Sequence, residues 1–307
     1  LLTLRYSATH KADSIYNMVY RLDAMEAYNK RLVKKIAVKG ITESGSTATE
    51  GFVYLESINL SKADPTATIQ FDYIGAKGLR KKTATVGIGY NLYDNSGESG
   101  KLDEYKEGFV VKSIDGRDNS VEFLNGIKIF AGDVIGKVSE DQLRRIQIRE
   151  TILSHLERER QLFHKGIKVL SLFFIDEVAK YKQYDEAGHP FNGIYADMFE
   201  EEYNDILSSM QREIGDEDYI QYLDAISAHD THAGYFSVDK KGKMTDSKLS
   251  DKKEGTSDDI DAYDLIMKNK ELLLDRDPKK SPVRFIFSHS ALREGWDNPN
   301  VFQICTL

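Results

Sequence analysis

The feature that most constrains the fold lies near the end of the sequence, where two short, largely apolar runs flank a polar loop. The runs are residues 283–287 and 301–305, and the loop between them carries Gly295, Asp297 and Pro299. Short apolar runs bounded by turn residues are typical of strands buried on both faces, as in the parallel sheets of α/β proteins. Open α/β sheets bind ligands at the carboxyl ends of their strands. The pattern therefore predicts an α/β domain with a site in this loop.

Composition indicates a folded protein of a reducing compartment. With 307 residues, of which 40% are hydrophobic and 30% charged, the chain can bury a core and is long enough for two domain-sized units. The single cysteine, Cys305, excludes a disulfide framework and is predicted to be an inert buried thiol. The sequence contains neither a run of about eighteen apolar residues nor a secretory signal, so we expect a cytoplasmic protein without a membrane span.

The charge balance argues against a broadly basic binding face. The formal net charge is −8, whereas proteins that bind nucleic acid usually carry a basic patch. Main-chain amides and helix N-termini can also bind phosphates, so the acidic balance weakens a role in DNA binding without excluding it. Basic residues do cluster locally, and the simplest interpretation is solvated faces offset by neighbouring acids. These clusters are Lys34, Lys35 and Lys39; Arg80, Lys81 and Lys82; and Arg144, Arg145 and Arg149.

Residues 40–137 have the pattern of an antiparallel β region. Glycine is frequent there, and short stretches, including residues 52–56, 68–73 and 85–92, alternate between apolar and polar side chains. The dipeptides at 115–116 (Asp-Gly) and 125–126 (Asn-Gly) are strong hairpin signals. We therefore predict a β-rich insertion over this range.

Helical spacing is found on both sides of the β-rich range. Apolar residues spaced on one face predict a single helix over residues 11–36. Residues 139–164 are expected to form a second helix, with Ser139 as its N-cap, and a strand is expected over 169–175. Further helices are predicted over residues 194–226 and 260–274. Residues 240–257 contain almost no apolar side chains, which predicts a loop or a disordered segment.

Several of these stretches resemble one protein family. Residues 290–302, Ser-Ala-Leu-Arg-Glu-Gly-Trp-Asp-Asn-Pro-Asn-Val-Phe, resemble motif V of superfamily 2 helicases in the form found in the Res subunit of type III restriction enzymes. Residues 4–10 are similar to motif III of the same motors, and residues 168–181 to motif IV. Residues 232–242 also resemble Res subunits. The resemblance implies a RecA-like second helicase domain, an α/β fold with a parallel sheet, interrupted by the antiparallel β-rich insertion.

The resemblance also implies roles for individual residues. The motif V loop would lie between nucleotide and DNA, and motif III would couple the state of the nucleotide to the grip on DNA. The expected nucleotide-binding residues are Gly295, Asp297 and Arg293. The expected coupling residues are Ser7, Ala8 and Thr9, and the expected DNA-binding residues are Ser288, Ser290, Glu294 and Tyr235.

One element of a complete motor is missing from the sequence. The phosphate-binding pattern Gly-x-x-x-x-Gly-Lys-Ser/Thr does not occur, and the nearest stretch, residues 97–102, lacks the first glycine and ends in Leu102. We therefore expect a middle piece of a larger motor, in which ATP and Mg²⁺ act in the parent protein and neither is bound by this chain alone. No catalytic residue set is complete here.

The predicted organisation follows from this interpretation. Residues 1–39 would form the end of the first RecA-like domain and a linking helix, 40–137 the insertion, and 138–307 the second RecA-like domain. The implied partners are duplex DNA, the modification (methyltransferase) subunits, and the first RecA-like and nuclease domains of the parent chain, with no membrane partner. The parent is expected to be an ATP-hydrolysing type III site-specific deoxyribonuclease.

Two other motifs allow alternative interpretations. Asp176 and Glu177 end an apolar run, as in a magnesium-holding Walker B strand, but no phosphate loop precedes them; we expect them to start the following helix. His229 and His232 could ligate zinc, but zinc needs three or four ligands and the sequence shows no partner cluster. A loop with hydrogen-bonded histidines is preferred, and no metal is predicted.

Two rival functions stay open at the level of sequence. The first is another superfamily 2 DNA motor, which would lack the nuclease. The second is a non-catalytic DNA-binding or assembly module, which the acidic balance favours.

Overall fold

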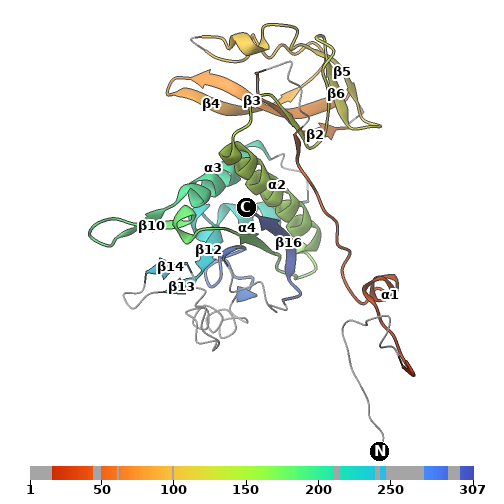
Figure 1. The fold of residues 1–307 in the computed structure, drawn as a ribbon, viewed down its shortest axis with the longest axis vertical. Helices are drawn as coiled ribbons and strands as arrows, with labels where there is room; N and C mark the ends of the chain where they lie inside the picture. Colours follow the sequence, from red (N-terminus) through yellow and green to blue (C-terminus); the bar gives the residue numbers. More distant parts are fainter. Residues whose placement is uncertain are drawn as a thin grey trace, which may run out of the picture. The chain divides into compact units, whose positions relative to one another are not determined.

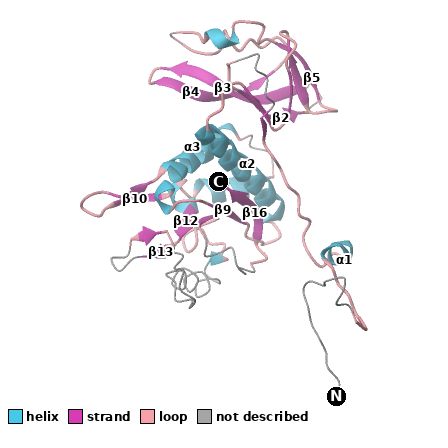
Figure 2. Cartoon of the chain, in the orientation of Figure 1, coloured by secondary structure: helices cyan, strands magenta, loops and turns pink. Residues whose placement is uncertain are grey.

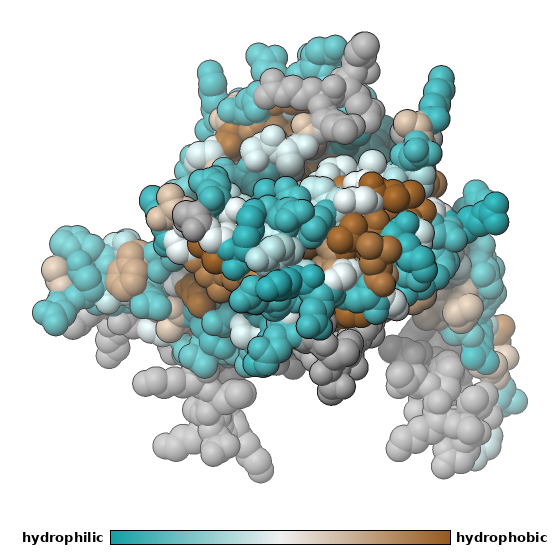
Figure 3. All heavy atoms as spheres, turned by 90° about the horizontal axis from the view of Figure 1, so that it is seen from above, coloured by the Kyte–Doolittle hydropathy of each residue, from teal (hydrophilic) through white to brown (hydrophobic). Residues whose placement is uncertain are grey.

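The computed structural model describes residues 16–43, 50–60, 62–98, 100–210, 215–238, 243–246, 273–289 and 298–307. Contacts divide the chain into two units, residues 1–40 and 41–307 (Figure 1). Among the described residues, none of the helices combines the length and apolar character needed to cross a bilayer. The face of the molecule in Figure 3 is largely hydrophilic, with smaller hydrophobic areas between the polar side chains.

The described part of the first unit, residues 16–40, contains one short helix, so the prediction of a continuous helix over residues 11–36 is wrong for that part. Helix α1 spans Ala24–Asn29 and is capped by Asp23, whose carboxylate accepts a hydrogen bond from the Glu26 amide at 2.8 Å. A helix stripe stabilises a helix only when another element covers it, because short helices are marginal in water. The apolar side chains of the predicted stripe are instead exposed: Met18, Val19, Leu22, Met25 and Leu32.

Residues 41–137 form the predicted β-rich region. A five-stranded sheet has the order β1-β8-β2-β3-β4, and its pairs are antiparallel except β1 with β8. A second, three-stranded antiparallel sheet has the order β5-β6-β7. The strands are β1 (Thr42–Glu43), β2 (Val53–Asn59), β3 (Thr66–Gly75), β4 (Gly78–Val86), β5 (Val111–Asp115), β6 (Ser120–Phe123), β7 (Lys128–Phe130) and β8 (Asp133–Ile135).

The turn signals in this region are confirmed, but one strand lies elsewhere than predicted. The expected hairpin turns separate β5 from β6 and β6 from β7, and Gly126 there has a φ of +85°. Strand β4 ends at Val86, whereas the alternating pattern predicted a strand over 85–92. The chain turns after Val86, where Gly89 has a φ of +85°, a conformation that strands do not use.

The remainder of the second unit is mixed α/β, as predicted. Four parallel strands form a sheet of order β12-β15-β9-β16. The predicted strand over 169–175 and both apolar runs of the C-terminal region belong to it. The strands are β9 (Leu170–Phe174), β12 (His232–Tyr235), β15 (Phe285–Ser288) and β16 (Val301–Thr306). Figure 2 shows these strands beside the helices that cover them.

The described part of the α/β region also contains three α-helices, α2, α3 and α4. Helix α2 (Glu140–Phe163) begins with the predicted cap, because Ser139 and Gln142 form a reciprocal capping box. The range 194–226 contains α3 (Ile194–Ser209) and α4 (Glu217–Asp224) in place of one helix. One face of the sheet, including Phe173, Phe285 and Phe287, shares a core with residues of α2 and α3.

Two short hairpins complete the described structure. Strands β10 (Lys182–Tyr184) and β11 (Pro190–Asn192) pair with each other, as do β13 (Ser237–Val238) and β14 (Met244–Thr245). Strand β14 falls within 240–257, the range predicted to be a loop, whose other residues lie largely outside the described part. The helix predicted over 260–274 also lies outside the described residues, apart from its last two positions.

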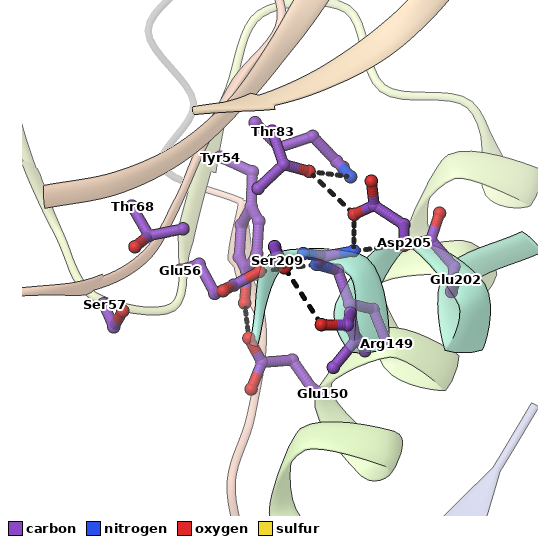
Figure 4. Close-up of polar contacts among 12 residues, drawn as sticks. Tyr54, Glu56, Ser57, Thr68, Thr83, Arg149, Glu150, Glu202, Asp205 and Ser209 are labelled. Atoms are coloured by element: carbon purple, nitrogen blue, oxygen red, sulfur yellow. Dashed lines mark hydrogen bonds and ion pairs between the residues drawn. The ribbon is translucent and has the colours of Figure 1, made fainter. Parts of the chain in front are cut away.

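A buried ion-pair network joins the β-rich region to α2 and α3 (Figure 4). The Arg149 guanidinium, with its side chain 2% exposed, contacts Glu56 of β2 at 2.5 Å, and Glu202 and Asp205 of α3 at 2.7 Å and 2.6 Å. The Tyr54 hydroxyl donates to the Glu150 carboxylate beside it. The β-rich region is therefore bound to the α/β core through α2.

Candidate functional site

Two of the site residues predicted from the sequence, Tyr235 and Ser288, are described by the structure, and both lie at the carboxyl edge of the parallel sheet. The strand register places Tyr235 opposite Ser288, Ser288 opposite Phe174, and Phe174 opposite Thr306. The last residues of all four strands therefore form one row. Because ligands of open α/β sheets bind beyond such a row, it is the first candidate for a functional site.

Ser288 and His289 present polar atoms at this edge. The Ser288 hydroxyl and the His289 Nδ1 atom are both buried, and neither has a hydrogen-bond partner among the described residues. Buried polar atoms are rarely left without a partner, because losing water without replacement costs about 1–3 kcal/mol. These two atoms therefore mark a place where another polar group fits. The exposed fraction of Ser288 is 0%, so its side chain does not reach solvent directly.

Tyr235 lies in the same row but belongs to an apolar cluster. Its side chain, like that of Phe174, packs against a core that includes Leu170, Leu172 and Ile286. Burial raises the pKa of the Tyr235 phenol. The ring is partly buried, so Tyr235 is a packed aromatic residue at the margin of the candidate site.

Asp176 and Glu177 follow β9 and start a short helical turn, as predicted. The Asp176 carboxylate accepts a hydrogen bond from the Glu177 amide at 2.9 Å and pairs with Lys180 at 2.5 Å. Partial burial raises the pKa of Asp176, but the Lys180 ammonium and the backbone amides lower it by more. The turn is the 3-10 helix Val178–Lys180 and not an α-helix.

The central residues of the predicted site lie outside the described residues. These are Ser7, Ala8 and Thr9 of the motif III stretch, and Ser290, Arg293, Glu294, Gly295 and Asp297 of the loop. The end of the loop is described: the Asn300 side-chain amide donates to the Lys168 carbonyl at 2.7 Å, just before β9. The connection thus leaves the carboxyl edge at Ser288 and returns at the opposite edge, where β16 begins at Val301.

Behind the sheet lies a buried charge cluster that the sequence analysis missed. Arg284, directly before β15, pairs with Glu159 of α2 at 2.7 Å, and both side chains are at most 2% exposed. Burial raises the pKa of Glu159, but the charges and hydrogen bonds of Arg284 and His155 together outweigh burial, and the pKa falls to about 2. Nearby, the His155 Nδ1 atom lies 2.7 Å from the Ser171 hydroxyl. The sequence did contain a signal for this cluster, because Arg284 is a charged residue within the apolar run at 283–287.

The two histidines singled out in the sequence analysis lie at the amino end of β12, opposite to the carboxyl edge described above. His232 is the first residue of β12, and His229 lies in the preceding 3-10 turn. Both are hydrogen-bonded, as predicted: the Glu200 Oε1 atom of α3 lies 2.9 Å from His229 Nδ1 and 3.2 Å from His232 Nε2. Burial lowers the pKa of His232 to about 4 despite the opposing effect of Glu200. Sequence spacing did not reveal Glu200 as the third group.

The basic residues that cluster in the sequence at 80–82 and at 144–149 have different surroundings in the structure. Arg145 and Arg149 pair with acids of α3, as predicted, but Arg149 is buried and does not lie on a solvated face. In β4, Lys81 pairs with Asp72 at 2.6 Å, whereas the neighbouring Lys82 lies over the Tyr73 ring, 4.8 Å from its centroid. Side chains alternate along a strand, so the basic residues of β4 do not form one continuous patch.

The fold and the edge described above define a class: a mixed α/β protein compatible with a RecA-like helicase domain carrying a β-rich insertion. The sequence comparisons are more particular. The chain is 33% identical over 314 aligned residues to the Res subunit of the type III restriction-modification enzyme EcoP15I of Escherichia coli, covering 99% of this chain and 28% of that protein. It is 32% identical to the EcoPI Res subunit of Escherichia phage P1, over 99% of this chain and 28% of the relative.

A third relative extends the same likeness. The StyLTI Res subunit of Salmonella typhimurium is 28% identical over 94% of this chain and 27% of its own length. The chain is therefore similar, over nearly its whole length, to part of the Res subunits of type III restriction-modification enzymes, and it spans just over a quarter of the relatives it matches. No protein-family model matches the chain. No solved structure matches it either.

Proposed function

We propose that the chain forms part of the ATP-dependent, helicase-like DNA translocase of a type III restriction endonuclease. The likeness to three Res subunits over nearly the whole chain carries this proposal. The row formed by Tyr235, Ser288 and the start of the loop at 289–300 supports it, because this is the edge at which an α/β sheet holds its ligands. In this proposal, Gly295, Asp297 and Arg293 face the nucleotide.

ATP and Mg²⁺ are the cofactors of the proposed motor, and the described residues fit one side of such a site. The unpartnered Ser288 hydroxyl and His289 Nδ1 suit a polar ligand or the loop that carries it. The sequence lacks a phosphate-binding glycine loop, so the phosphates and the metal would be held by other parts of a Res subunit. Ser288, Ser290, Glu294 and Tyr235 would lie toward duplex DNA, while Ser7, Ala8 and Thr9 would couple the two sites.

The proposed partners follow from the same assignment. The motor would act on duplex DNA together with modification subunits, and would work with a first RecA-like domain and a nuclease domain. The net charge of −8 favours DNA contact through a few main-chain and side-chain groups over a broad basic face. The divided basic residues of β4 agree with a local contact.

The test is ATP hydrolysis by a complete Res subunit carrying these 307 residues, assembled with a modification subunit and measured with and without duplex DNA. We expect DNA-stimulated hydrolysis that Asp297→Ala abolishes and Ser288→Ala reduces. The matched controls are Asp218→Ala in the first turn of α4 and Ser208→Ala on α3, both exposed, and they are expected to leave hydrolysis unchanged. DNA binding without any hydrolysis would instead support a non-catalytic module.

A further inference from the structure

Three side chains from three elements converge at the amino end of β12. Glu200 comes from α3, His229 from the 3-10 turn and His232 from the strand itself. One ligand atom of each lies within 4.8 Å of the others. The His229 and His232 rings stand nearly perpendicular, with an interplanar angle of 79°. Two imidazole nitrogens and a carboxylate oxygen thus face one point.

The surroundings fix the orientation of this group. The His232 side chain is 2% exposed, and its Nδ1 atom lies 2.9 Å from the Tyr181 hydroxyl. The Asn192 side-chain amide donates to Glu200 Oε1 at 2.8 Å. Hydrogen-bonded partners of this kind hold the rings and carboxylates of metal sites in place. A tyrosine hydroxyl can donate or accept, so it supports the His232 tautomer that leaves Nε2 free to bind a metal ion.

We propose that Glu200, His229 and His232 bind a divalent transition-metal ion, with Zn²⁺ as the first candidate. Two histidines and a glutamate are a ligand set of zinc sites that keep a further position open. To bind the ion, His229 Nδ1 and His232 Nε2 must each be free of a proton, which the other nitrogen of the same ring can carry. His229 is 63% exposed, so the site is accessible and its remaining position is open to water.

The proposed metal site is separate from the nucleotide and DNA edge. His232 begins β12 and Tyr235 ends it, so the two sites lie at opposite ends of one strand, roughly 10 Å apart. A bound ion would tie α3 to the edge of the sheet. The proposal goes beyond the motor assignment and does not depend on it.

The test is titration of the purified 307-residue chain with Zn²⁺ by calorimetry, and with Co²⁺ by visible absorption. We expect one saturable site, and a Co²⁺ spectrum with imidazole and oxygen ligands. His229→Ala and Glu200→Gln are each expected to weaken binding by at least about tenfold, and Tyr181→Phe by about 10–100-fold. His229 is exposed, so its removal leaves the core intact, which thermal unfolding of the apo variant checks.

The matched control is His189→Ala. His189 forms an exposed pair with Asp185 at 3.1 Å and can bind metal ions only as an isolated surface histidine. Unchanged binding in His189→Ala, with loss in His229→Ala, supports the proposal. A Zn²⁺ dissociation constant weaker than about 1 mM, or equal losses in both variants, overturns it.

Discussion

Replacing Arg149 by methionine tests the buried ion-pair network that joins the β-rich region to the α/β core. The substitution keeps much of the side-chain volume but removes the only charge that contacts Glu56, Glu202 and Asp205 together among the described residues. The Glu56 and Glu202 side chains are 10% and 6% exposed, so water cannot replace the guanidinium. Asp205 is 48% exposed and contributes little, because solvent screens it.

The expected loss follows from the burial of these carboxylates. Removing one partner of a buried ion pair costs about 3–5 kcal/mol when the other charge is left without compensation. Glu56 loses its ion pair in this way, whereas Glu202 keeps its pair with Arg145 at 3.0 Å. For a unit of this size, that loss lowers the melting temperature by on the order of 10 °C. The assay is urea unfolding followed by circular dichroism. Arg158→Met on the same helix is the matched control. Among the described residues its exposed side chain bonds only Gln161, and a loss within about 0.5 kcal/mol is expected.

The pH dependence of the variant adds a second check. Burial raises the pKa of Glu56, and Arg149 opposes that effect. Without Arg149 the pKa rises further, so protonation favours the folded state and the deficit shrinks as the pH falls from neutrality towards 4.5, the ordinary value. If Arg149→Met lost less than about 1 kcal/mol in the free energy of unfolding, as little as Arg158→Met, the ion-pair network would not stabilise the contact between the β-rich region and the α/β core.

Three further predictions follow from single contacts. The contribution of Glu159 to the free energy of unfolding is expected to be constant above pH 4.5 and to be lost as the pH falls towards 2, because its folded pKa is lowered. Acid titration of Glu159→Gln, which lacks this carboxylate, should show a shallower fall. Ser139→Ala removes the α2 capping box and is expected to cost about 1 kcal/mol in urea unfolding, with no loss contradicting the cap. Gly136→Ala places a Cβ atom 2.2 Å from the Gly51 carbonyl oxygen at a φ of +88°, so calorimetry should show a larger loss than for Gly126→Ala, where φ is +85° but the space is open; equal losses would refute the close contact.

Local patterns predicted those parts of the fold that depend on neighbouring residues. The apolar runs at 283–287 and 301–305 correspond to strands of the parallel sheet, and Ser139 caps α2 as its type and position indicated. The hairpins around 115–116 and 125–126 were readable because turns need particular residues at particular positions. The helix predicted over 11–36 failed because spacing alone does not provide a surface to pack against.

Groups that meet through the tertiary fold were not predictable in the same way. Arg149 and Glu56 are 93 residues apart, and Glu200 lies 29 residues before His229. Residue type showed that each could be charged or bind a ligand, but only the fold brings them together. The row joining Tyr235 to Ser288 likewise depends on strand order, which a single sequence does not specify.

The most direct test of the central claim is hydrogen–deuterium exchange in a complete Res subunit carrying this chain, bound to a modification subunit. Exchange is measured with and without duplex DNA and a non-hydrolysable ATP analogue. We expect slower exchange on ligand addition at residues 175–177, 235–238 and 288–300, which follow the strand ends, and no change in the β10–β11 hairpin. Unchanged exchange in all three segments, with both ligands shown to be bound, would contradict the placement of the motor site at the carboxyl edge of the sheet.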